Sequence, residues 1–111
     1  MDCLFCKIIE KSIPGEIVYE DDQVIAFKDI HPKADIHVLV IPKRHIQSLA
    51  GLSEADAALI GHLIVVTSRL AKELGIESGF KVAVNSGLKA GQEVDHLHIH
   101  LMGGRFHSHL A

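Results

Sequence analysis

Residues 96–101 read His-Leu-His-Ile-His-Leu, and this stretch decides the fold. Three histidines alternate with three aliphatic residues. In a β-strand, side chains two residues apart point to the same face of the sheet. The stretch therefore predicts a strand with three imidazoles on one face and its aliphatic side chains on the other. A helix would instead spread the histidines over more than half of its circumference. The alternative to a functional row of histidines is a strand with an accidental polar face.

A row of imidazoles offers chemistry near neutral pH, because each ring can act as a nucleophile, base, acid or metal ligand. Protonation of one ring disfavours protonation of its neighbours, since like charges at strand spacing repel. His98 has a neighbour on each side, so we expect it to stay neutral and nucleophilic. His96 and His100 are then left to carry protons or hydrogen bonds.

The rest of the chain predicts an α+β fold of about five strands in an antiparallel sheet, with one short N-terminal helix and one long helix. Short connections between the strands favour antiparallel pairing. Besides the histidine stretch, which supplies the fifth strand, β-branched and apolar runs predict strands over residues 17–20, 24–28, 36–41 and 80–85.

Capping and periodicity place the two helices. The short helix is expected over residues 3–11, with Asp2 as its N-cap. The long helix is expected to begin after Ser53, to carry a one-sided apolar stripe, and to end at Gly75. His62 lies on this helix away from any motif, so we expect it at the surface.

Composition limits the class of protein. The 111 residues suit a single domain, expected to span 1–111, and the 48% hydrophobic residues can fill one core. A net charge of −3, no tryptophan and no long basic run argue against nucleic-acid or membrane partners. Neither a membrane span nor a signal peptide is visible, and two cysteines do not make a secreted disulfide framework. We therefore expect a cytoplasmic protein.

The histidine stretch continues as Leu-Met-Gly-Gly-Arg at residues 101–105. Together they resemble the signature of the histidine triad (HIT) family, and Gly-Gly-Arg resembles its Hint-like branch of nucleoside phosphoramidate hydrolases. Further segments in the family's order and spacing are residues 26–30, 36–43, Asn85 and 91–93. The resemblance covers nearly the whole chain, from residue 3 to residue 105.

The resemblance implies a homodimer whose sheets join across the subunits, and hydrolysis of purine nucleotides such as AMP derivatives. His98 would attack the α-phosphorus and expel an amine, and water would then cleave the nucleotidyl-histidine. His100 matches the phosphate-contacting member of the triad, while His37 and His96 match the other positions of the family's histidine cluster. No cofactor is expected to be required for this chemistry.

The same resemblance implies a nucleotide site. Asp29 matches the ribose position, where a carboxylate can accept hydrogen bonds from both hydroxyls, although by itself it is typical of a turn. Residues matching the apolar base pocket are Phe5, Ile8, Phe27 and Ile30, which pattern alone would place in the core. Residues matching the phosphate and leaving-group region are Asn85, Gly91, Gln92 and Glu93.

Glu93 departs from the serine that some relatives carry near the leaving group. A carboxyl group kept protonated there would act as an acid, whereas an ionised one would favour a cationic amine such as lysine. The third alternative is a solvated loop glutamate. Asp95 likewise replaces an aromatic residue often found before the first triad histidine, a change expected to affect packing and not chemistry.

Cys3 and Cys6 have the spacing of zinc ligands but make only half a site. Packed thiols are the alternative, and a redox motif would lack its usual βαβ context. His45 and His96 are the best candidates for the remaining ligands, as in similar histidine triad proteins with Cys-x-x-Cys. Such a Zn²⁺ would be structural, and it would prevent His96 from relaying protons.

Two other functions stay open. One is a dinucleoside polyphosphate hydrolase of the same family, which the Gly-Gly-Arg continuation disfavours. The other is a zinc- or nucleotide-binding regulatory module with little turnover, which the intact triad disfavours.

Overall fold

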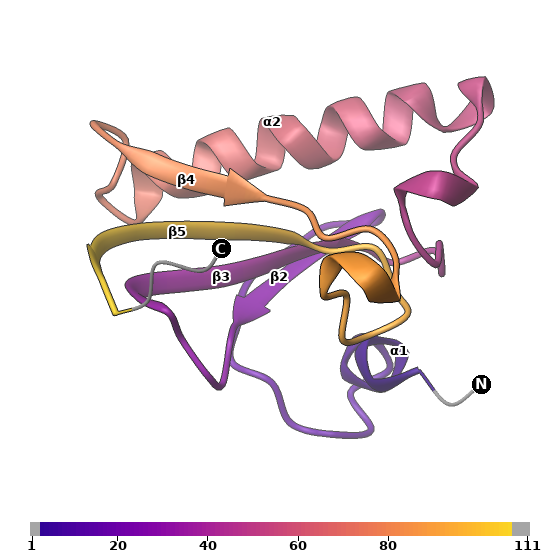
Figure 1. Cartoon of the computed structure of the whole chain (residues 1–111), viewed down its shortest axis with the longest axis horizontal. Coiled ribbons are helices and arrows are strands. Elements are labelled where there is room, and N and C mark those ends of the chain that lie inside the picture. Colours follow the sequence, from indigo (N-terminus) through magenta and orange to yellow (C-terminus); the bar gives the residue numbers. More distant parts are fainter. Residues whose placement is uncertain (1–2, 108–111) are drawn as a thin grey trace.

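The computed structural model describes residues 3–107. Its sheet is antiparallel with the strand order β1-β2-β3-β5-β4, and α1 and α2 lie on opposite faces of it (Figure 1). The elements are α1 (Leu4–Ile9), β1 (Ile17–Glu20), β2 (Val24–Lys28), β3 (Ala34–Pro42), α2 (Ala57–Glu73), β4 (Phe80–Ala83) and β5 (Ile99–Phe106), with short 3₁₀ turns at Leu49–Gly51, Glu54–Asp56 and Leu88–Ala90. The predicted α+β fold is confirmed.

Each face of the sheet has its own core, because side chains alternate along the central strands. On β3, Val38 and Val40 face α2, whereas Leu39 and Ile41 face α1. A strand buried on both faces shows a nearly continuous apolar run instead of alternation, as residues 36–41 do. The main contributions of the helices are Leu63, Val66 and Leu70 from α2, and Phe5 and Ile8 from α1.

The histidine stretch differs from its prediction in one respect. β5 begins only at Ile99, so the expected strand is wrong for residues 96–98. This first half is held by the Leu97 N–H, which donates to the Ile46 carbonyl at 2.7 Å. The two-residue alternation still separates the side chains, since Ile99 and Leu101 join the core under α2 while the imidazoles face the other way.

The helix ends also differ from expectation. α1 is shorter than residues 3–11, and Cys3 occupies its N-cap position, where Sγ accepts from the Cys6 N–H; the predicted cap, Asp2, lies outside the described residues. Ser53 and Asp56 form a capping box around a 3₁₀ turn that precedes α2. Within residues 3–107, neither helix is long and apolar enough to cross a bilayer.

His62 on α2 is not simply a surface residue, as was expected. It is half-buried, and its Nε2 lies 2.6 Å from Oδ2 of Asp21. Burial raises the pKa of Asp21, but hydrogen bonds from Tyr19, from two main-chain N–H groups and from His62 outweigh it and hold that pKa well below its usual range. The ionised carboxylate therefore ties the β1–β2 turn to α2.

Candidate active site

A cavity of about 800 Å³ opens beside α1, between the loop after β2 and the segment that precedes β5. Its size is typical of a small-molecule site. Phe5 and Phe27 meet edge to face in its apolar wall, with ring centroids 5.2 Å apart. All four residues expected to form the base pocket line the cavity, and Ile30, 84% exposed, lies open to solvent. The four residues to which the family resemblance assigned the base pocket therefore lie in the lining of one cavity.

His98 lies in the cavity wall with a defined tautomer. Its Nδ1 is 2.7 Å from the main-chain carbonyl oxygen of His96. A carbonyl oxygen only accepts, so Nδ1 carries the proton and Nε2 keeps its lone pair. The Phe5 ring packs against this imidazole at 5.2 Å between centroids and fixes its plane. In this tautomer the imidazole is held in the cavity wall with the Nε2 lone pair free of the contact to the His96 carbonyl.

His100 is oriented by a chain of hydrogen bonds. The Lys33 N–H donates to Nδ1 of His37 at 3.0 Å, so His37 carries its proton on Nε2. This Nε2–H donates to Nδ1 of His100 at 2.9 Å. His100 must then carry its own proton on Nε2. Since His100 lines the cavity and His37 does not, the chain ends in a single donor at the cavity.

Burial keeps these imidazoles neutral. It lowers the pKa of His37 and of His96, and it is the largest cause that lowers the pKa of His100 to about 4, followed by the neighbouring His98 and His37. At neutral pH, His96 and His100 are therefore uncharged, and each ring keeps one N–H that can donate a hydrogen bond.

Asp29 lines the cavity beside this chain. Its Oδ1 accepts from the His31 N–H at 2.9 Å, and its Oδ2 lies 3.4 Å from Nε2 of His37. A carboxylate has about four acceptor sites, so both oxygens retain capacity for a ligand. Asp29, His37 and His100 lie close enough to suggest a metal site. The proton on Nε2 of His37 instead forms the hydrogen bond to His100, and Asp29 lies alongside this pair.

The loop before β5 contributes the remaining expected residues. Asn85, Gly91 and Glu93 line the cavity, and Glu93 is exposed. Gln92 is not a lining residue: its Oε1 accepts from the Gly87 N–H at 2.7 Å, and its Nε2 donates to the carbonyls of Gln47 and Val94. This placement favours a role in shaping the loop over direct contact with a ligand.

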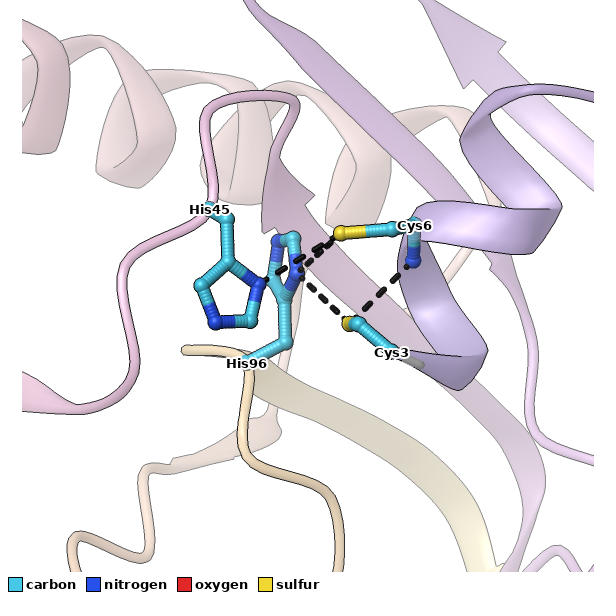
Figure 2. Close-up of side chains that lie close together, drawn as sticks. All are labelled: Cys3, Cys6, His45 and His96. Atoms are coloured by element: carbon cyan, nitrogen blue, oxygen red, sulfur yellow. Dashed lines mark hydrogen bonds between the residues drawn. The ribbon is translucent and has the colours of Figure 1, made fainter. Parts of the chain in front are cut away.

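Cys3, Cys6, His45 and His96 converge beside the cavity although they come from three separate segments (Figure 2). Their sulfur and nitrogen atoms all lie within 4.8 Å of one another. Nδ1 of His96 is 3.3 Å from Sγ of Cys3, and Nδ1 of His45 is 3.4 Å from Sγ of Cys6. The predicted Cys₂His₂ group is therefore assembled in space.

The tautomer of His96 suits a metal ligand. Its Nε2 lies 2.8 Å from the Pro42 carbonyl oxygen and so carries the proton, which leaves the Nδ1 lone pair directed at the thiols. His96 does not line the cavity. His96 cannot both bind Zn²⁺ and relay protons, and this geometry favours metal binding.

Similarity to known proteins identifies the family of this chain. The family model described as HIT domain matches residues 10–107. Protein HitA of Neisseria gonorrhoeae is 47% identical over 102 residues, which cover 92% of this chain and 95% of that protein. The chain belongs to the HIT family.

Solved HIT structures share the fold of this HIT protein. The crystal structure of a HIT family hydrolase from Legionella pneumophila is 38% identical, covers 97% of both chains and superposes with a TM-score of 0.93. A histidine triad nucleotide-binding protein from Candida albicans is 36% identical over 90% of this chain and 73% of that one, with a TM-score of 0.83. The HIT protein described here therefore has a hydrolase-type fold.

Sequence reasoning missed two contributors to the site of this HIT protein. The main-chain N–H of Lys33 fixes the tautomer of His37. Asp35 holds the loop that carries Lys33 against the end of β5. No sequence signal could have identified Lys33, because every residue except proline has the same main-chain N–H.

Proposed function

We propose that this HIT protein hydrolyses the P–N bond of purine nucleoside phosphoramidates of the AMP-amine type. The observation that carries the proposal is the orientation of His98, whose Nδ1–H is held by the His96 carbonyl so that Nε2 is a nucleophile at the cavity wall. A phosphorus centre is the natural electrophile for an imidazole.

In this mechanism Nε2 of His98 attacks the α-phosphorus, and the P–N bond breaks as the new N–P bond forms. The amine nitrogen takes up one proton from solvent as it leaves, and the water that attacks in the second step returns one proton to solvent. Water then attacks the phosphorus of the nucleotidyl-histidine, the imidazole departs, and the nucleoside monophosphate is released. The His96 carbonyl stabilises the positive charge that develops on the ring, while the Nε2–H of His100 donates to a non-bridging phosphate oxygen.

In this proposal the remaining cavity residues bind the purine, the ribose and the leaving amine of the substrate. We assign the purine to the apolar wall formed by Phe5, Ile8 and Phe27, with Ile30 at the cavity rim, and the ribose hydroxyls to Asp29. Asn85, Gly91 and Glu93 lie where the amine leaves, and we assign Gln92 to the shape of that loop. An exposed glutamate there favours a cationic amine, such as one derived from lysine, over an anionic leaving group.

The test compares hydrolysis of an adenosine phosphoramidate with that of a dinucleoside polyphosphate by the wild-type protein. We expect the phosphoramidate to be the better substrate and His98→Ala to lose essentially all turnover while it stays folded. His31→Ala, which removes an exposed histidine beside the same cavity, is expected to keep most of the turnover.

Acid-quenched wild-type protein should carry a nucleotidyl adduct on the peptide that contains His98. An adduct on His96 or His100 would overturn the mechanism. Preference for the dinucleoside polyphosphate would favour that hydrolase class instead. Binding of AMP without turnover of either substrate would indicate a regulatory module.

We also infer that Cys3, Cys6, His45 and His96 bind one structural Zn²⁺. Ligands about 2.3 Å (sulfur) and 2.0–2.1 Å (nitrogen) from a tetrahedral Zn²⁺ lie about 3.5 Å from each other. The sulfur–nitrogen distances of 3.3, 3.4 and 3.6 Å fit this geometry. Four protein ligands close the coordination shell, so the ion would hold α1 to the sheet and would not activate water.

We further propose that the whole chain forms one HIT domain. We also propose that two chains associate as a homodimer. β4 is an edge strand, and edge strands with free main-chain groups pair readily with another strand. Phe80 and Val82 on β4 are exposed, as are Ile64 and Val65 on α2. Pairing of two β4 strands would join the sheets of two subunits and cover these apolar side chains.

A further inference from the structure

The C-terminal end of β5 contains a β-bulge opposite the start of β3. Ala34 pairs with Phe106, but Ile36 pairs with Gly103, so β5 has one residue more than β3 over this interval. Gly104 lies in the interval with φ of +77°, in the left-handed region that favours glycine. A bulge leaves main-chain groups outside the regular ladder, where they need other partners.

Asp35 supplies such a partner. Its Oδ2 accepts from the Arg105 N–H at 2.8 Å, and its Oδ1 lies 3.1 Å from Nε2 of His107. The Arg105 N–H, followed by His107, lowers the pKa of this carboxyl group, which is therefore ionised at neutral pH. A Cβ at position 104 would lie 2.9 Å from the Asp35 Cβ, so only glycine permits this close approach.

The same segment holds Lys33 by its main chain. The His107 N–H donates to the Lys33 carbonyl at 2.7 Å. The Lys33 N–H donates in turn to Nδ1 of His37, whose Nε2 is 2.9 Å from Nδ1 of His100. A continuous series of hydrogen bonds therefore runs from the end of β5 to the cavity.

We propose that Asp35 is a positioning residue for the active site. By holding residues 104–107 against the loop, it keeps the Lys33 N–H on His37, and so keeps His100 in the tautomer that donates from Nε2 into the cavity. Asp35 itself does not line the cavity. The inference rests on the proposed role of His100 as the hydrogen-bond donor to the phosphate. It makes phosphate recognition depend partly on the contacts of Asp35, which lie outside the cavity.

The tautomers can be read directly from the ¹⁵N chemical shifts of the histidine side chains by NMR at pH 7. In the wild-type protein we expect both His37 and His100 to be protonated on Nε2 only. In Asp35→Ala we expect His37 to populate both tautomers. AMP affinity should then fall about three- to tenfold, as expected for one weakened charge-assisted hydrogen bond, while adenosine affinity stays unchanged.

Two further variants test the mechanism of this effect. Asp35→Asn retains an oxygen that can accept from the Arg105 N–H, so it should restore most of the tautomer preference. Arg105→Ala removes a side chain that is 84% exposed but leaves the main-chain donor in place, so it should behave as the wild type. If Asp35→Ala does not fold, the tautomers of His37 and His100 in Asp35→Asn and in the wild-type protein still test the proposal.

A proton on Nδ1 of His37 in the wild-type protein would overturn the proposal, and so would unchanged tautomers in Asp35→Ala. An equal loss of affinity for AMP and adenosine would overturn it as well, because that would reflect a general structural defect. These measurements need no turnover. A wild-type protein with the expected tautomers but no phosphoramidase activity would refute the proposed function alone.

Discussion

At the scale of single residues, main-chain groups decide what each imidazole can do. The His96 carbonyl places the proton of His98 on Nδ1, the Pro42 carbonyl places that of His96 on Nε2, and the Lys33 N–H places that of His37 on Nε2. In the proposed function one residue type thereby supplies a nucleophile, a metal ligand and a hydrogen-bond donor, because each ring has two distinct nitrogens.

Asp29 is expected to recognise the ribose. A 2′,3′-dideoxy analogue of AMP should bind more weakly than AMP to the wild-type protein, by about ten- to a hundredfold, because hydrogen bonds to a charged group are lost. Asp29→Ala should bind the two ligands about equally. Calorimetric titration of both ligands provides the measurement, and equal binding by the wild type would remove Asp29 from the ribose site.

Stability should depend on pH through His100. Its pKa is about 4 in the folded protein, against an ordinary histidine value of about 6.5 in the unfolded chain. Between these values the unfolded chain binds more protons, so the free energy of unfolding falls as pH falls, by about 2 kcal/mol at pH 5 from this residue.

The variant His100→Asn should lose this contribution, because the amide oxygen can accept from the Nε2–H of His37 and does not titrate in this range. Urea denaturation of both proteins at pH 7 and pH 5 measures the difference. If the two proteins lost the same free energy between these pH values, burial of His100 would not be the cause.

At the scale of elements, α1 is too short to be stable alone and depends on its contacts with the sheet. Phe5 and Ile8 pack on β2 and β3, and the Cys₂His₂ group lies at the N-terminal end of α1. Burial, with smaller contributions from the nearby Cys3 and Glu10, raises the pKa of the Cys6 thiol to about 11. A bound cation would reverse this preference, because the ligand to zinc is the thiolate.

We therefore expect protein purified without a histidine tag to contain about one zinc per chain. Cys3→Ser or His45→Ala should lower both the zinc content and the melting temperature, where each kcal/mol corresponds to about 4–8 °C in a domain near this size. Turnover should fall far less than in His98→Ala. Metal-free protein of unchanged melting temperature would identify the cysteines as packed thiols.

At the scale of the whole molecule, the sheet leaves different surfaces at its two edges. β1 forms one edge, and β4, beside β5, forms the other. Exposed apolar side chains of β4, Phe80 and Val82, lie at the second edge, whereas Lys11 and Glu20 pair near the first. This asymmetry favours self-association through β4.

Sedimentation analysis should therefore give the mass of two chains for the wild-type protein. Val82→Lys or Val65→Glu should shift it toward one chain, since each buries an unpaired charge in the proposed interface. Asp22→Lys, on the turn between β1 and β2, is the matched control and should remain dimeric. A monomeric wild type at micromolar concentration would exclude this assembly.

The sequence by itself determined the architecture and identified about half of the residues that line the cavity. β-branched and apolar runs located most of the strands, and apolar periodicity with the Ser53 cap located the long helix, because these are local properties of the chain. The family signature predicted site roles for His98, Asp29 and the apolar wall, all of which line the cavity. The strand boundary at Ile99 was missed, because the first half of the histidine stretch contacts the loop after β3 and not a neighbouring strand.

Only the tertiary structure decided how the histidines are used. Residues as distant in sequence as Cys3 and His96, or Lys33 and His107, come together only when the sheet and α1 are assembled. The proton position on each imidazole follows from main-chain groups at those contacts, and these groups are the same for nearly every residue type. The sequence therefore contains the histidines, while the fold assigns the role of each nitrogen.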